Sequence, residues 1–229
     1  MIADVLRYPV VDPGGRTALL WSAGAVLALA VGRRYAGALA PDALAVVPAA
    51  FAVVAVVALL GTLSAVLVAA PSTPRSSVRD GAAALALSVA LLAPPAALLA
   101  VTVSTAGGGD PRTAALPFLV GSTAATLLFG ACAYALPAAL AAATRAGRLR
   151  AALDGAVVAT LADARYFLRW VVGFALAVAG AGLAGVTARS GDATGLLAAA
   201  GAGYLLVAGA RSAGVGYARA TGTKTSDRP

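Results

Sequence analysis

The residues that could do chemistry in this 229-residue chain are few, and one stretch of them matches a catalytic pattern. The sequence GGGD at positions 107–110 fits the Gly-x-Gly-Asp pattern of intramembrane aspartyl proteases. That reaction needs two facing carboxylates, one acting as acid and one as base. Asp110 is followed by Pro111 and Arg112, which is typical of a turn, and no second aspartate lies within an apolar segment. The pattern therefore favours a flexible connector over a protease site.

The other nucleophiles and metal ligands also lack partners in the sequence. A serine protease needs a general base, and the chain contains no histidine and no glutamate. We expect the hydroxyls of Ser88 and Ser122 to bond to carbonyls of their own helices. Cys132 is the single cysteine, which excludes an intrachain disulfide, and together with nine aspartates it supplies none of the common zinc ligand sets. We therefore predict no catalytic residue, no cofactor-binding residue, no metal ligand and no enzymatic activity.

The composition predicts an integral membrane protein. Hydrophobic residues make up 61% of the chain, the mean hydropathy is +0.90, and several apolar runs are long enough to cross a bilayer. The net charge of +8 would suggest nucleic acid in a soluble protein. In a membrane protein it instead indicates arginines that contact anionic lipid headgroups, so we expect lipids and no nucleic acid as partners.

The apolar runs predict the fold class as an all-α, polytopic integral membrane helix bundle. We expect one membrane domain over 1–220 and a polar, disordered tail over 221–229. The first run is short, because it has only 15 residues, 17–31, before Gly32 and two arginines interrupt it. The chain has five spans if this run does not cross the membrane. The expected spans are 17–39, 44–70, 81–103, 113–143, 164–186 and 195–218, with loops at 71–80 and 104–112.

Two further segments have the pattern of helices that lie on the membrane surface. One is the amphipathic start of the chain, at about 2–8. The other is 149–161, where Leu149, Leu153, Val157 and Leu161 recur every four residues. We expect both segments to be interfacial helices.

Prolines and glycines predict where the spans bend and pack. Each proline removes an intrahelical hydrogen bond. Small residues allow membrane helices to approach closely, which predicts a contact between the last two spans. The glycines of this contact are Gly180, Gly182 and Gly185 facing Gly201, Gly203 and Gly209, and the expected kinks are at Pro94, Pro95, Pro117 and Pro137.

Arginines and aromatic residues at the ends of the spans predict the membrane interface and the orientation. Thirteen of the seventeen basic residues fall on the side that holds both termini and only four fall on the other, which predicts cytoplasmic termini in the cell membrane. The densest basic turn follows the fourth span, where Gly147 ends the helix. The expected interface residues are Arg145, Arg148, Arg150, Arg165, Tyr166, Arg169, Trp170 and Arg211.

Four stretches together resemble a known family. They are DVLRYPVVDP near the start, VRDGAAALALSVALLAPP in the third span, YALPAALAAATRAGRLRAALD at the fourth span, and ARSAGVGYAR near the end. In order and spacing they resemble the uncharacterised multi-pass membrane proteins grouped as domain of unknown function 4013, found in halophilic archaea and in bacteria. The resemblance implies a fold and a membrane location, and it implies no activity and no catalytic residues.

The function that these observations favour is a non-enzymatic scaffold or a subunit of a membrane assembly. It combines an absence of catalytic chemistry with a large basic face, and it predicts a protein partner or a second copy of the chain. The alternative is a transporter for a small solute without ion coupling, because every charged residue lies at an end of a predicted span. An intramembrane enzyme is the third alternative.

Overall fold

The computed structural model describes residues 2–70, 74–106 and 111–222, and every regular element in these ranges is a helix. Within the described residues, six helices are long and apolar enough to cross a membrane. They are α2 (Pro13–Leu39), α3 (Val46–Val68), α4 (Pro74–Ala106), α5 (Pro111–Ala146), α7 (Ala164–Arg189) and α8 (Ala193–Ala220). The shorter elements are α1 (Ile2–Val11), η1 (Ala43–Ala45), η2 (Leu149–Leu153) and α6 (Gly155–Leu161). The chain is therefore an all-α, multi-pass membrane protein, as its hydropathy predicts.

The first span is longer than the sequence analysis expected. Asp12 caps α2, because its Oδ1 accepts a hydrogen bond of 3.0 Å from the backbone N–H of Gly15. Pro13 occupies the first helical position, where its missing N–H costs nothing. These two residues start the helix at 13 instead of 17 and give it 27 residues. This length favours six spans over five.

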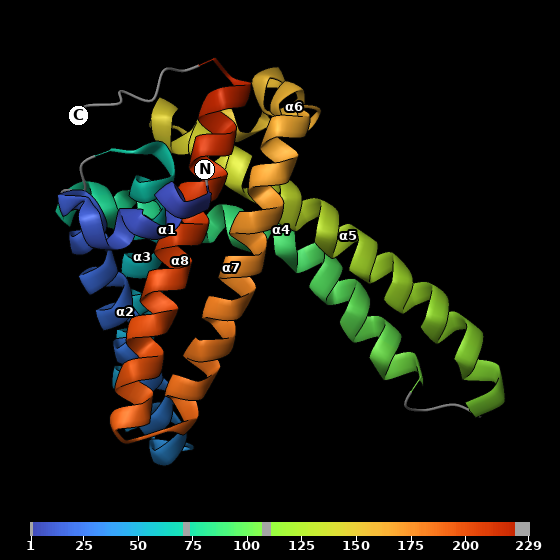
Figure 1. Cartoon of the computed structure of the whole chain (residues 1–229). Helices are drawn as coiled ribbons and strands as arrows, with labels where there is room; N and C mark the ends of the chain where they lie inside the picture. The colour runs from blue at the N-terminus through green and yellow to red at the C-terminus, as the bar shows by residue number, and fades with distance from the viewer. Residues whose placement is uncertain (1, 71–73, 107–110, 223–229) are drawn as a thin grey trace.

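The helices form an upright bundle with one arm (Figure 1). The helix α8 packs against α1, α2, α3 and α7. The helices α4 and α5 pair with each other to form the arm, and the arm diverges from the bundle toward the connection between these two helices. The helix α1, the last turn of α8, the end of α3, the start of α4, and α6 lie at one end of the molecule, here called the terminal end. The opposite end, here called the distal end, carries η1 and the connection from α7 to α8.

Glycines set the distance between α8 and its neighbours. Gly173 and Gly209 face each other across the α7–α8 contact, and a Cβ on either would lie 2.8 Å from the carbonyl oxygen of the other. Gly214 lies against the carbonyl of Leu67 on α3. No residue larger than glycine fits at these three positions unless the backbone of one helix moves.

The predicted glycine contact between the last two spans is formed only in part. Gly180, Gly201 and Gly209 contact the facing helix, while Gly203 faces Ala23 of α2. The other two predicted glycines, Gly182 and Gly185, have nothing within 4 Å of a built Cβ.

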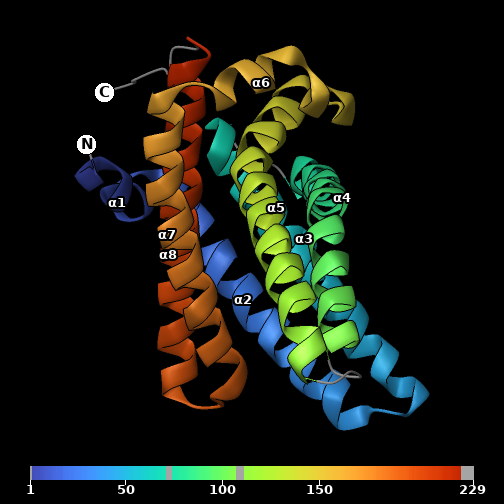
Figure 2. The ribbon, with the colours of Figure 1, turned by 90° about the vertical axis from the view of Figure 1, so that its right-hand side faces the viewer.

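The helix α4 begins within the stretch predicted as a loop and changes direction along its length. It starts at Pro74, again with proline at the helix start, so the expected loop at 71–80 is helical from 74 onward. Its first part runs across the bundle and is seen end-on in Figure 2, whereas its second part descends beside α5. Pro94 and Pro95 lie inside this helix, Pro94 exposed and Pro95 buried. A pair of prolines removes two consecutive intrahelical bonds and permits such a change of direction.

The segment 149–161 is not the single helix that its four-residue repeat predicts. It divides into the 3-10 helix η2 and the helix α6, with the extended residue Asp154 between them. Val157 is buried, but Leu153 is 85% exposed, so the four repeated residues do not share one face. The GGGD stretch at 107–110, the side chain of Pro117, and residues 223–229 of the expected tail lie outside the described residues.

Candidate functional site

An aromatic cluster joins α5 to α7 near the terminal end. Tyr166, Trp170 and Phe174 recur every four residues on α7 and so lie on one face of it. The rings of Trp170 and Phe174 stack with centroids 5.0 Å apart, and the ring of Tyr134 on α5 meets Trp170 edge-on at 5.0 Å. Phe167 completes the cluster, with its centroid 5.9 Å from that of Tyr134. We call these five residues the aromatic clamp.

The aromatic clamp replaces the hydrogen bond that Pro137 removes from α5 and adds a second one beside it. Proline at position 137 has no N–H to donate to the carbonyl of Ala133, four residues earlier. The indole Nε1 of Trp170 donates to that same carbonyl oxygen at 3.0 Å. The hydroxyl of Tyr166 donates at 2.9 Å to the adjacent carbonyl, that of Tyr134. In a lipid environment a carbonyl without a partner is costly, so α7 stabilises the proline-containing turn of α5.

A third hydrogen bond ties the aromatic clamp to the terminal end. The hydroxyl of Tyr134 donates at 2.7 Å to the carbonyl of Leu161, the last residue of α6. This carbonyl is one of the four at the end of a helix that lack an intrahelical donor. The aromatic clamp thus fixes α5, α6 and α7 relative to one another.

An apolar groove lies beside the aromatic clamp, between the arm and the bundle. It has a volume of 310 Å³ and is bounded by α3, α4, α5, α7 and α8. Trp170, Phe174 and Phe129 supply aromatic rings to its walls, and the hydroxyls of Ser64 and Ser88 are its polar side-chain groups. The other lining residues are Leu60, Leu63, Leu67, Leu92, Ala133, Leu136, Pro137, Leu140, Gly173, Ala177, Leu206, Gly209, Ala210 and Ala213. We call this space the apolar groove.

Ser64, like Ser22 on α2, differs from the hydroxyl residues that donate within their own helices. Thr62 and Thr160 donate to carbonyls of their own helices, at 2.9 and 2.8 Å, and Ser122 donates to the carbonyl of Leu119 as expected. The side chain of Ser64 is only 2% exposed, and its Oγ has no hydrogen-bond partner in the structure. A buried hydroxyl without a partner is unfavourable, which marks this position.

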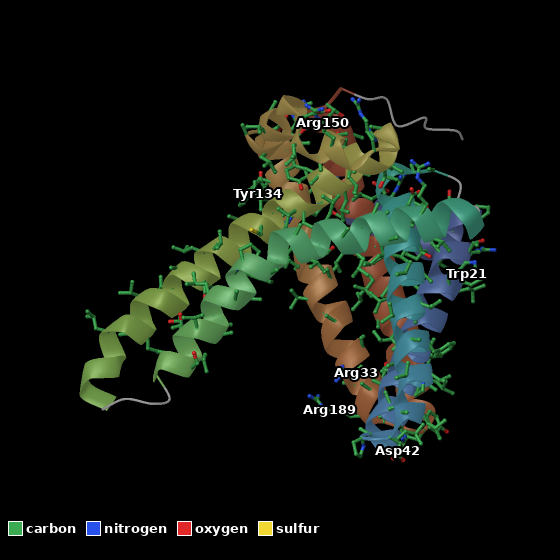
Figure 3. All side chains as sticks on the ribbon, turned by 180° about the vertical axis from the view of Figure 1, so that it is seen from behind. Trp21, Arg33, Asp42, Tyr134, Arg150 and Arg189 are labelled. Carbon is green, nitrogen blue, oxygen red and sulfur yellow. The ribbon has the colours of Figure 1, made fainter. Side chains whose placement is uncertain are left out.

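The arginines predicted for the interface occupy the terminal end in two ways. Arg148, Arg150 and Arg165 are exposed, and Figure 3 shows Arg150 at this end, far from Arg33 and Arg189 at the distal end. Two other arginines lie over tyrosine rings. The guanidinium of Arg145 is 4.9 Å from the ring centroid of Tyr217, and that of Arg211 is 4.8 Å from that of Tyr8.

Three residues of the predicted aromatic and basic belt of α7 are partly or wholly buried within the protein. Tyr166 has no exposed surface and belongs to a buried cluster with Leu67. Trp170 and Arg169 are half-buried, and the carbonyl of Arg169 accepts a hydrogen bond of 2.9 Å from Ser212. The spacing of Tyr166 and Trp170, combined with a proline in another apolar span, is the sequence signal that could have indicated the aromatic clamp.

The arrangement has little capacity for acid–base or metal chemistry. Within the described ranges, no three His, Cys, Asp or Glu side chains lie close enough to hold a metal ion. Cys132 is half-buried on α5, outside the lining of the apolar groove. What the described residues of the apolar groove offer is an apolar surface with two hydroxyls, which suits an apolar ligand.

The fold and this site define the class of the protein as a multi-pass helical membrane protein with an apolar groove. No protein family, no curated protein and no solved structure matches the chain.

Proposed function

We propose that the protein is a non-enzymatic subunit or scaffold of a membrane assembly and that the α4–α5 arm is the element that binds its partner. The observation behind this proposal is that α4 and α5 both diverge from α7 in Figure 1, and the angle between the arm and α7 is here called the wedge. Among the described residues, the diverging part of the hairpin lies away from the other helices, which leaves it available to a second membrane helix.

The face of α5 toward the wedge is suited to helix contact. Thr126 and Gly130 precede Ala133 and Pro137 at helical spacing, so all four lie on the same face of α5. Ala133 and Pro137 line the apolar groove, whereas Gly130 has open space around a built Cβ. Small residues four apart are typical of surfaces where membrane helices meet. The partner helix would therefore contact Thr126 and Gly130, nearer the tip of the arm than the apolar groove.

Purification in mild detergent tests the proposal. The expected result is a complex larger than the monomer, containing a second copy or a different membrane protein. Gly130→Leu should abolish the complex because it adds bulk on the wedge face, while Ala124→Leu adds the same bulk on an exposed position of the opposite face and should retain it. A monodisperse monomer from the unmodified chain, or equal behaviour of both variants, would contradict the proposal.

The proposal includes the membrane and the lipids that surround this assembly. The exposed arginines of the terminal end would contact anionic headgroups in the cytoplasmic leaflet of the cell membrane. We also propose, from the four sequence stretches alone, a relationship to domain of unknown function 4013, which would imply a membrane location and no activity.

A second function is favoured by the position of the apolar groove between two helices that contain prolines within their spans. Such bends are places where transporters form substrate paths, so the alternative is passage of a small uncharged solute. Solute flux in proteoliposomes would test it, and Pro94→Ala or Pro95→Ala should change that flux. No flux above that of empty vesicles would exclude the solutes examined.

A further inference from the structure

The apolar groove combines enclosure by five helices, aromatic walls and a buried hydroxyl without a partner. Each of these three features restricts what can occupy it, and together they point to one chemical class of ligand. We propose that the apolar groove binds one hydrocarbon chain of a membrane glycerolipid, and that the ester or ether oxygen linking this chain to glycerol accepts a hydrogen bond from Ser64.

The apolar groove is too small to enclose a helix of a partner protein. A helix is about 10 Å wide and rises about 5.4 Å per turn, so one turn occupies about 400 Å³. The groove has 310 Å³, which is less than one turn. The volume lies at the lower end of the range of about 300–1,000 Å³ typical of small-molecule sites. A flexible hydrocarbon chain fits such a space because it needs no fixed cross-section.

The walls select an apolar occupant. The stacked rings of Trp170 and Phe174 form one wall, and their planes are 19° from parallel. The polar atom of Trp170 is already used, since Nε1 donates to Ala133. The rings therefore present carbon surface to the groove. The bilayer around the protein contains hydrocarbon chains at high concentration, so an apolar groove within the spans is filled from the membrane before it is filled from water.

The hydroxyl of Ser64 requires that the ligand carry one hydrogen-bond acceptor. Its Oγ is buried and unpaired, and a hydrogen bond donated by this hydroxyl would remove the cost of a buried polar group without a partner. Ser88 lines the same groove from α4. Glycerolipids carry an acceptor oxygen at the end of each hydrocarbon chain, so they meet both requirements in one molecule.

Tryptophan fluorescence offers a direct test, because the chain has two tryptophans and only one lines the groove. Trp21 is 62% exposed on α2, and Trp21→Phe leaves Trp170 as the single reporter. The protein would be reconstituted in phosphatidylcholine vesicles that contain increasing fractions of phosphatidylcholine with brominated acyl chains, which quench indole fluorescence on contact. A bound chain predicts quenching that saturates at a low brominated fraction. Quenching that only follows the bulk fraction would overturn the proposal.

Matched variants separate the groove from the lipid around the protein. Ala177→Leu fills the groove and should remove most of the saturable quenching, whereas Ala175→Leu, on an exposed position of the same helix, should leave it unchanged. Ser64→Ala should shift saturation to a higher brominated fraction, and Ser22→Ala, which removes an equally buried and unpaired hydroxyl outside the groove, should not.

The Ser64→Ala comparison remains decisive if Ala177→Leu does not fold, since it removes a single oxygen atom. Identical saturation in the Ser64→Ala and Ser22→Ala proteins would overturn the role of the acceptor. The partner-binding arm is tested by co-purification with different variants, so the two proposals fail independently.

Discussion

Pro137 creates a hydrogen-bonding requirement that residues on another helix meet. The carbonyl of Ala133 loses its donor, and Trp170 supplies one from α7. The sequence predicts a bend at Pro137, and the spacing of the aromatic residues of α7 predicts that Trp170 and Tyr166 belong to an interfacial belt. Aromatic residues with a polar atom suit both roles, and only the packing of α7 on α5 distinguishes them.

This pairing predicts a non-additive effect on stability. Trp170→Phe should lower the free energy of unfolding by about 1 kcal/mol, because hydrogen bonds between membrane helices average about 0.6 kcal/mol and an unpaired carbonyl adds a cost. Pro137→Ala returns an N–H to α5, so the same tryptophan substitution should cost less in that background. A double-mutant cycle by denaturant unfolding in detergent measures the difference. Equal costs in both backgrounds would show that Trp170 acts only through its ring.

Tyr8 predicts a dependence of stability on alkaline pH. Burial raises the pKa of Tyr8 above its ordinary value of 10.0, and the charge of Asp12 raises it further, while the guanidinium of Arg211 opposes the rise. The folded protein thus holds this proton more tightly than the unfolded chain does. The contribution of Tyr8 is complete below pH 10.0 and is lost as the pH rises through its folded pKa.

The Tyr8→Phe protein provides the comparison for this effect. Phenylalanine keeps the ring under Arg211 and removes the ionisable hydroxyl. Plots of thermal midpoint against pH for the two proteins should be parallel at neutral pH and separate above pH 10.0, with the unmodified protein falling faster. Parallel plots throughout would show that the Tyr8 proton is not linked to folding.

At the scale of elements, the positions of glycines predict which helix contacts resist change. A methyl group at Gly214 would overlap the carbonyl of Leu67 on α3, and it cannot be accommodated by rotating a side chain. Gly214→Ala should therefore lower stability by about 1–3 kcal/mol, the usual cost of overpacking. Gly182→Ala is the control, because nothing lies within 4 Å of the added atom. Thermal unfolding in detergent should show a loss for the first and none for the second.

The boundaries of elements were predictable where local chemistry sets them. The cap by Asp12 with Pro13 after it, and Pro74 at the start of α4, are signals that a sequence carries, although hydropathy alone placed these starts at 17 and 81. The break at Asp154 was hidden by the repeat of Leu149, Leu153 and Val157. A four-residue repeat places its residues on one face only if the helix is continuous. Here the helix is interrupted at Asp154, between η2 and α6.

At the scale of the whole molecule, hydropathy was sufficient for the fold class and insufficient for the site. Six apolar runs predict six spans because the bilayer requires continuous helices. The apolar groove depends on side chains from five helices, including Leu60, Phe129 and Leu206. These residues are far apart in the sequence, and their spacing does not predict that they line the same groove. The divergence of the arm is likewise a property of tertiary packing, which no pattern within α4 or α5 specifies.

The distribution of arginines over the two ends predicts the orientation. The chain places thirteen basic residues on the side of both termini and four on the other, and a positive cytoplasmic side is the general rule. Exposed positions at the two ends are Ala159 on α6 and Thr194 on α8. In a Cys132→Ala background, which removes the native thiol, an impermeant maleimide should label Thr194→Cys in intact cells and Ala159→Cys only after lysis. The background protein should remain unlabelled throughout. The reverse labelling pattern would contradict the predicted orientation. It would place the exposed arginines Arg148, Arg150 and Arg165 away from the anionic leaflet that we propose they contact.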